Sequence, residues 1–209
     1  MNKKQLFNFP YYEFFNNSID TNELISQAKN TLIKTPNIFN EIYKDPSGNR
    51  AFYNKELLVW IQSCIDTVSK NEFDNMELVV TDCWFNSTSR YQKHHEHFHP
   101  NSILSGIFYL TDSDVGTCFS SSNPWTEWLS PVFSFNPTLN TQTTIVSAEK
   151  GKLIIFPSNI LHFTKPNTSN NIRYSIAFNT FFNGSFGWPI ADLDINTKSK
   201  FKVSTNGLG

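Results

Sequence analysis

The chain has 209 residues, of which 39% are hydrophobic, and its 17 basic and 18 acidic side chains give a formal net charge of −1. This composition can bury the core of one globular domain. No cluster of lysines and arginines is interleaved with aromatic residues, so nothing predicts a nucleic-acid partner.

No run approaches the roughly 20 apolar residues needed to span a bilayer, and the first residues lack the apolar core of a signal peptide. The three cysteines, Cys64, Cys83 and Cys118, have no C-x-x-C spacing. Their number and spacing argue against a disulfide framework or a thiolate zinc site. We therefore expect a cytoplasmic protein with no membrane association.

Two amphipathic helices are predicted in the N-terminal part of the chain. Asp20 to Glu23 has the pattern of a capping box, and one apolar stripe follows it before Pro36: Leu24, Ile25, Ala28, Leu32 and Ile33. A second stripe predicts a helix from about Asn54 to Ser69: Leu57, Leu58, Ile61, Cys64, Ile65 and Val68.

From residue 77 onward the pattern changes to short β-branched and aromatic runs separated by Asn, Ser, Pro and Gly. These runs predict strands at 77–85, 103–110, 143–147, 152–156 and 173–182. We expect one domain over residues 1–209, with an N-terminal helical layer (1–75), an antiparallel β core (76–185) and a C-terminal tail (186–209).

A long segment without clear alternation, 119–142, interrupts the predicted strands. It carries four large aromatic residues: Trp125, Trp128, Phe133 and Phe135. Loops of this length are often lids or binding loops, so the segment is a candidate lid or substrate platform. Some of its aromatics are also expected to pack beneath the loop.

All five histidines fall in two places, four of them within 94–99 and the fifth at His162. Imidazole is the commonest protein ligand for divalent first-row metals. In an extended segment His95, His97 and His99 share one face. Two neighbouring ligands and one remote ligand predict an open metal site of the kind used in catalysis. The alternative is a set of solvated surface histidines.

A cation and a hydroxyl follow the last histidine. Arg173 and Ser175 lie on one face of their predicted strand, opposite the face that carries Tyr174. We expect His162 to open a strand that pairs with this one through the turn 165–171. Such a hairpin would hold a metal ligand and the arginine in one cavity.

Together these residues resemble the Fe(II)/2-oxoglutarate-dependent dioxygenase superfamily, whose signature is His-x-Asp/Glu, a distal His and Arg-x-Ser. The matching residues are His97-Phe-His99, then His162, then Arg173-Tyr-Ser175. From about Leu78 to Phe182 the chain further resembles a bacterial and phage group of 2-oxoglutarate oxygenases. The resemblance implies a mainly β fold with N-terminal helices, a cupin-like double-stranded β-helix (jelly-roll).

His99 departs from the signature, which has Asp or Glu at this position. Three neutral imidazoles leave Fe(II) with its full double charge. Three-histidine iron sites occur in cupin-type thiol dioxygenases, so iron remains compatible with this ligand set. A second register stays open, in which His94-His95-Glu96 supplies the His-x-Glu element beside His162. In the first register His95 and Glu96 would orient ligands or line the rim.

The resemblance implies an oxidoreductase, a 2-oxoglutarate-dependent dioxygenase that uses Fe(II), 2-oxoglutarate and O2. The metal ligands and catalytic centre would be three histidines: His97, His99 and His162. Arg173 would hold the remote carboxylate of 2-oxoglutarate with its two-point fork, and Ser175 would add a hydrogen bond. Tyr109 would meet the same carboxylate from the opposite sheet, or else is an ordinary core tyrosine.

The implied reaction converts 2-oxoglutarate to succinate and hydroxylates a small-molecule or peptidyl substrate. The sequence specifies neither that substrate nor the oligomeric state. Two other functions fit the same residues. One is a cupin-like three-histidine metalloenzyme that uses no 2-oxoglutarate, and the other is a non-enzymatic jelly-roll module that binds a structural ion.

Overall fold

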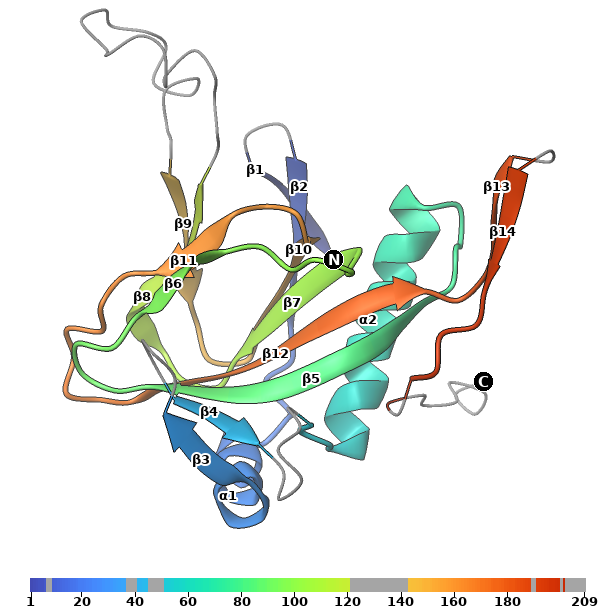
Figure 1. Ribbon diagram of the computed structural model, residues 1–209. Coiled ribbons are helices and arrows are strands. Elements are labelled where there is room, and N and C mark those ends of the chain that lie inside the picture. The colour runs from blue at the N-terminus through green and yellow to red at the C-terminus, as the bar shows by residue number, and fades with distance from the viewer. Residues whose placement is uncertain are drawn as a thin grey trace, which may run out of the picture.

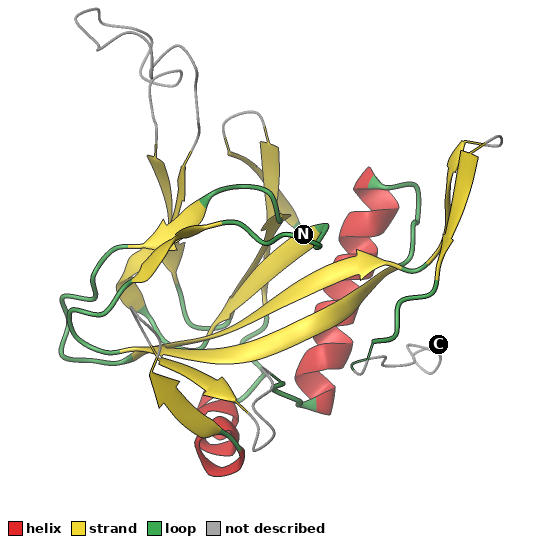
Figure 2. Ribbon diagram, in the orientation of Figure 1, coloured by secondary structure: helices red, strands yellow, loops and turns green. Residues whose placement is uncertain are grey.

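The structure is a computed structural model that describes residues 1–6, 9–36, 41–44, 51–120, 143–188, 191–199 and 201. Two antiparallel sheets face each other, and two helices lie against the outer face of the larger one (Figure 1). Strands dominate the described chain (Figure 2). No helix among the described residues is long and apolar enough to cross a membrane.

The larger sheet has eight strands. Their order across the sheet is β1 (Asn2–Leu6), β2 (Phe9–Phe15), β10 (Lys152–Pro157), β7 (Leu104–Tyr109), β12 (Arg173–Phe182), β5 (Leu78–Thr88), β4 (Glu41–Lys44) and β3 (Ile33–Pro36). The smaller sheet has four strands, in the order β6 (His94–His97), β11 (His162–Thr164), β8 (Ser113–Ser120) and β9 (Thr143–Ala148). A hairpin of β13 (Gly184–Trp188) and β14 (Ala191–Ile195) follows.

Both helices begin at the predicted caps. The Asp20 carboxylate accepts from the backbone N–H groups of Asn22 and Glu23 at the start of α1 (Thr21–Thr31). The Asn54 side chain accepts from the N–H of Leu57 at the start of α2 (Lys55–Glu72). Both helix starts were therefore predicted correctly from local capping signals.

The main hydrophobic core lies between the helices and the larger sheet. The predicted stripe of α2 faces this sheet, and its Ile61 is fully buried. Strand β12 directs Tyr174 and Ile176 into the same core. Its alternate residues Arg173 and Ser175 consequently face the smaller sheet, and they share one face opposite Tyr174, as their spacing predicted.

The N-terminal part of the chain is less helical than expected. Residues 1–75 supply four strands of the larger sheet in addition to α1 and α2. The helix stripe was extended too far, because Leu32 already has extended backbone angles and Ile33 opens β3. A β-branched run that can pair with β4 gains more there from the sheet than from another helical turn.

Strand β8 was missed by sequence reasoning. Its side chains alternate between the two faces of the strand, with Val115, Thr117 and Phe119 on one face. Asp114 and Gly116 lower the strand propensity of the segment. The candidate lid, residues 119–142, lies outside the described residues except for Phe119 and Ser120, which end β8.

The predicted hairpin between His162 and Arg173 is wrong. Strand β11 pairs with β6 and β8 in the smaller sheet, whereas β12 pairs with β5 and β7 in the larger one. The connecting loop crosses between the sheets, held by the Asn167 amide, which donates to the carbonyls of Thr88 and Asn171. His162 and Arg173 therefore face each other from the two sheets.

Candidate metal centre

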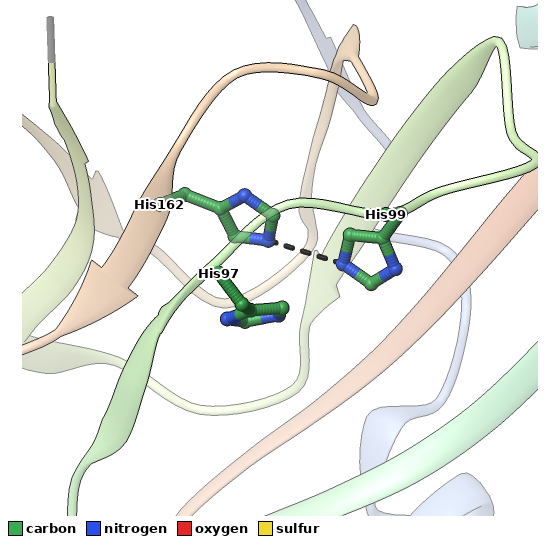
Figure 3. A group of neighbouring side chains, drawn as sticks. All are labelled: His97, His99 and His162. Carbon is green, nitrogen blue, oxygen red and sulfur yellow. Dashed lines mark hydrogen bonds between the residues drawn. The ribbon is translucent and has the colours of Figure 1, made fainter. Parts of the chain in front are cut away.

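Three histidines from different segments of the smaller sheet converge. His97 ends β6, His99 lies in the loop that follows, and His162 begins β11 directly opposite His97. One ring nitrogen of each lies within 4.8 Å of the others. The Nε2 atoms of His99 and His162 are 3.2 Å apart, and Figure 3 shows the three rings turned toward one another.

Backbone carbonyls orient two of these rings. His97 Nδ1 lies 2.8 Å from the carbonyl oxygen of His95, and His162 Nδ1 lies 2.9 Å from that of Ile160. An Nδ1–H that donates to a carbonyl leaves the Nε2 lone pair free for a metal. The backbone N–H of His99 donates to the carbonyl of Ser158, which fixes the turn beside the other two rings.

The spacing and charge state of these rings fit a divalent ion. Two nitrogens bound at about 2.1 Å and about 90° apart on one ion are about 3.0 Å from each other, close to the 3.2 Å between His99 and His162. Burial lowers the pKa of His162 well below its ordinary value, and the neighbouring His97 lowers it further by a smaller amount. The neutral, metal-binding form is therefore favoured.

A register shift in β6 changes the predicted faces of the histidine cluster. His162 pairs with His97 but Thr164 pairs with His94, so β6 holds one extra residue in this interval. His94 therefore lines the same pocket as His97, with their ring centroids 4.5 Å apart. His95 is exposed and does not line the pocket, although its ring lies 5.0 Å from that of His97, so the expectation that it shares the site-facing side with His97 and His99 is corrected.

Glu96 lies outside the histidine cluster. Its carboxylate accepts a hydrogen bond from the Ser120 hydroxyl, and its side chain is exposed. The metal-binding geometry joins His97, His99 and His162 and does not include Glu96. The alternative register through His94-His95-Glu96 therefore has no geometric support in the described structure.

Arg173 lies across the pocket from the cluster and is 7% exposed. Its Nη1 donates to the carbonyl of Val115 at 3.0 Å, and its Nη2 lies 3.4 Å from the Thr88 hydroxyl. Its Nε–H is buried without a partner, and no carboxylate among the described residues forms an ion pair with it. Burial lowers its pKa, yet arginine stays protonated, so the pocket contains an unpaired cation.

Ser175 and Tyr109 lie next to each other in the larger sheet, at paired positions of β12 and β7. Both line the pocket. Tyr109 therefore belongs to the same sheet as Arg173, not to the opposite one as expected. Its fully buried hydroxyl is 2.6 Å from that of Thr117, and burial raises its pKa to about 12. The phenol stays neutral at physiological pH.

One pocket between the sheets joins the histidine cluster to Arg173, with an empty volume of about 560 Å³, open mouth included. Trp84 and Ile107 form an apolar part of its floor, and the Trp84 ring lies 5.6 Å from that of His99. Thr88 and Thr117, which contact Arg173 and Tyr109, were not assigned to the site from the sequence, and His94 was considered only as part of the second register. Only the alternation around Thr117 could have drawn attention to one of them.

The family model described as "Putative 2OG-Fe(II) oxygenase" matches residues 82–179, which include the histidine cluster, Arg173, Ser175 and Tyr109. Over this segment the chain is similar to the 2OG-Fe(II) oxygenase family. This match agrees with the resemblance found in the sequence, and an oxidoreductase is the enzyme class that the matched family implies. No curated protein matched the chain.

Several solved structures share the fold of this chain. HygX from Streptomyces hygroscopicus, with nickel, 2-oxoglutarate and hygromycin B bound, has a TM-score of 0.57 at 14% identity, over 81% of this chain and 82% of its own. A Pseudomonas putida prolyl-4-hydroxylase has a TM-score of 0.55 at 14% identity, over 83% of this chain and 93% of its own.

The α-ketoglutarate-dependent epimerase SnoN from nogalamycin biosynthesis has a TM-score of 0.60 at 10% identity, over 84% of this chain and 78% of its own. At such low identity these likenesses show the fold alone. That fold is the expected one: the chain has a double-stranded β-helix, mainly β with N-terminal helices.

Proposed function

We propose that the protein is an Fe(II)- and 2-oxoglutarate-dependent oxygenase that hydroxylates an organic substrate while converting 2-oxoglutarate to succinate and CO2. The observation that carries this proposal is the buried, unpaired Arg173 in one pocket with three converging imidazoles. A buried cation without a partner is costly, and a dicarboxylate that also chelates a metal would supply the missing charge.

His97, His99 and His162 would hold the iron. When bound, Fe(II) supplies the activation of O2 for the reaction, in which one oxygen atom enters the substrate and the other enters succinate. The three imidazoles leave positions open for ligands, unlike a structural site closed by four protein ligands. This openness is the reason for preferring an enzyme to a non-enzymatic metal-binding module.

The remaining side chains would bind and orient the cosubstrate. Arg173 presents the two-point fork that a carboxylate prefers, and its contacts with Val115 and Thr88 fix the plane of the guanidinium. Ser175, on the same strand face, can donate to the same carboxylate. Tyr109 is committed to Thr117 and would close the end of the pocket.

The substrate would be a small molecule or a peptidyl side chain that meets the metal beside the cosubstrate. We propose that the enzyme works in the cytoplasm, because all three cysteines are free and buried, as in proteins of reducing compartments.

The test is release of succinate from 2-oxoglutarate by the purified protein with Fe(II) and O2. We expect slow uncoupled turnover that the variants His162→Ala and Arg173→Ala abolish. His95→Ala is the matched control, because His95 is exposed beside the site. Absence of succinate in the parent under oxygen, with iron bound, would contradict the proposal.

A second candidate is a cupin-like metalloenzyme that uses the three histidines without 2-oxoglutarate. His99 favours it, because this residue stands where the family signature has a carboxylate. The same assay separates the two functions. Iron binding and oxygen consumption that do not depend on 2-oxoglutarate or Arg173 would support the second candidate.

A further inference from the structure

The pocket contains few formal charges. Its described lining includes one arginine and no lysine, aspartate or glutamate. Glu96 faces Ser120 outside it. Asp82 lies on the β5 strand face that carries Trp84 and is paired across the sheet with Asn179, but it is not part of the lining. His99 stands where the family signature has a carboxylate ligand. The described residues that line the pocket therefore contribute one positive charge and no negative charge.

Among the described residues the charges of the pocket do not balance once the ligands of the proposed function are bound. The metal contributes two positive charges, Arg173 one, and 2-oxoglutarate two negative ones, so one positive charge remains. A carboxylate at position 99 would cancel it. In a pocket between two packed sheets, an uncompensated charge is strongly disfavoured and attracts a counter-ion.

We propose that the substrate brings this charge, so that the enzyme acts on an organic anion whose carboxylate or similar monoanionic group binds beside the metal. This inference rests on the proposed function and adds its substrate class. Neutral hydrogen-bond donors surround the space next to the cluster: His94 on the smaller sheet, and Trp84 and Asn86 on the larger one. They can orient an anion but cannot replace its charge.

The experiment measures whether a second anion binds while 2-oxoglutarate stays in place. The protein is loaded with Co(II) without oxygen, saturated with 2-oxoglutarate, and titrated with acetate, with its neutral counterpart acetamide, and with chloride. The visible absorption of Co(II) reports binding at the metal, and the free 2-oxoglutarate concentration reports whether it is displaced. The same titrations use His99→Gln, which is neutral, and His99→Asp and His99→Glu, which restore a negative charge.

We expect acetate to bind without displacing 2-oxoglutarate in the parent and in His99→Gln. Its preference over acetamide should fall by about tenfold or more in the acidic variants, because they remove one unit of local charge. Having both acidic variants protects the comparison if one of them fails to fold or to hold cobalt.

Three outcomes would overturn the inference. One is an equal preference for acetate in neutral and acidic variants, and another is acetate that binds only by expelling 2-oxoglutarate. The third is chloride that binds more tightly than acetate and prevents acetate from binding. A free inorganic anion would then balance the charge that we assign to the substrate. Failure of 2-oxoglutarate itself to bind would instead contradict the proposed function.

Discussion

Arg173 is held rigidly by neutral groups, so its charge is available to a ligand. Among the described residues its guanidinium donates to a carbonyl and to a hydroxyl, and its Nε–H has no partner. The sequence indicated the strand face on which it lies, because side-chain alternation depends only on local geometry. The partners Val115 and Thr88 come from other strands, and no local pattern could have named them.

Replacing Arg173 tests its role in binding the cosubstrate. We expect Arg173→Ala to weaken 2-oxoglutarate binding at least about 30-fold, corresponding to the loss of about 2 kcal/mol or more for a buried charge pair. Arg173→Lys should lie between parent and alanine, because it keeps the charge and loses the fork. Calorimetric titration on the Ni(II)-loaded protein measures both, and equal affinity in all three proteins would remove Arg173 from this role.

His94 and His95 form a matched pair for testing the histidine cluster. The ring of His94 stacks on that of His97 inside the pocket, whereas His95 is exposed. We expect His94→Ala to lower the affinity for Ni(II) by about tenfold, as for groups that support a metal ligand. His95→Ala keeps the carbonyl that orients His97 and should match the parent in a chelator competition. Equal effects of the two substitutions would contradict the observed faces of β6.

At the level of elements, the sequence predicted which segments form helices or strands better than it predicted which strands pair with each other. Both helix starts and the five strand runs were found, because caps and hydrophobic periods are local signals. The shift in β6 and the sheet to which β11 belongs were not found. Each depends on which strands become neighbours, and one extra residue is enough to exchange His94 for His95 on the pocket face.

Strand β8 supports the pocket from the smaller sheet, and Gly116 tests that support. A Cβ at this position would overlap the backbone carbonyl of Val146 on β9, which no side-chain rotation can relieve. We expect Gly116→Ala to lower the free energy of unfolding by about 1–3 kcal/mol. It should also weaken 2-oxoglutarate binding, since the neighbouring Val115 holds Arg173.

Urea unfolding and cosubstrate titration measure these two effects of Gly116→Ala. Asp114→Ala, at an exposed position of the same strand, is the control and should resemble the parent. An unchanged unfolding midpoint in the glycine variant would show that β8 and β9 are not packed as closely as described.

For the whole molecule, strands from both ends of the chain form one sheet. Strand β2 pairs with β10, and β4 pairs with β5, so the N-terminal strands continue the sheet that carries the site residues. This continuity supports the proposal that residues 1–209 act as one domain. Length and composition had suggested it, but they do not show which strands join the sheet.

His94 and His162, which both line the pocket, predict a pH dependence of stability for the metal-free protein. Burial, and next His97, lower the pKa of His94 to about 3, and His162 is also lowered. In the unfolded chain both take up protons below about pH 6.5, whereas in the folded chain they remain neutral, so stability falls as the pH falls. We expect a loss on the order of 2–4 kcal/mol between pH 7 and pH 5.

Urea unfolding at the two pH values measures this loss. His162→Asn, which cannot be protonated in this range, should show a clearly smaller pH dependence than the parent. An identical dependence in both proteins would mean that His162 is not held neutral by the fold.

A crystal structure with Ni(II) and 2-oxoglutarate bound would test the metal centre and the cosubstrate pocket together. We predict one ion bound by the Nε2 atoms of His97, His99 and His162, chelated by the cosubstrate, whose remote carboxylate contacts Arg173. An ion bound through Glu96, or an Arg173 that contacts no atom of the cosubstrate, would contradict this account.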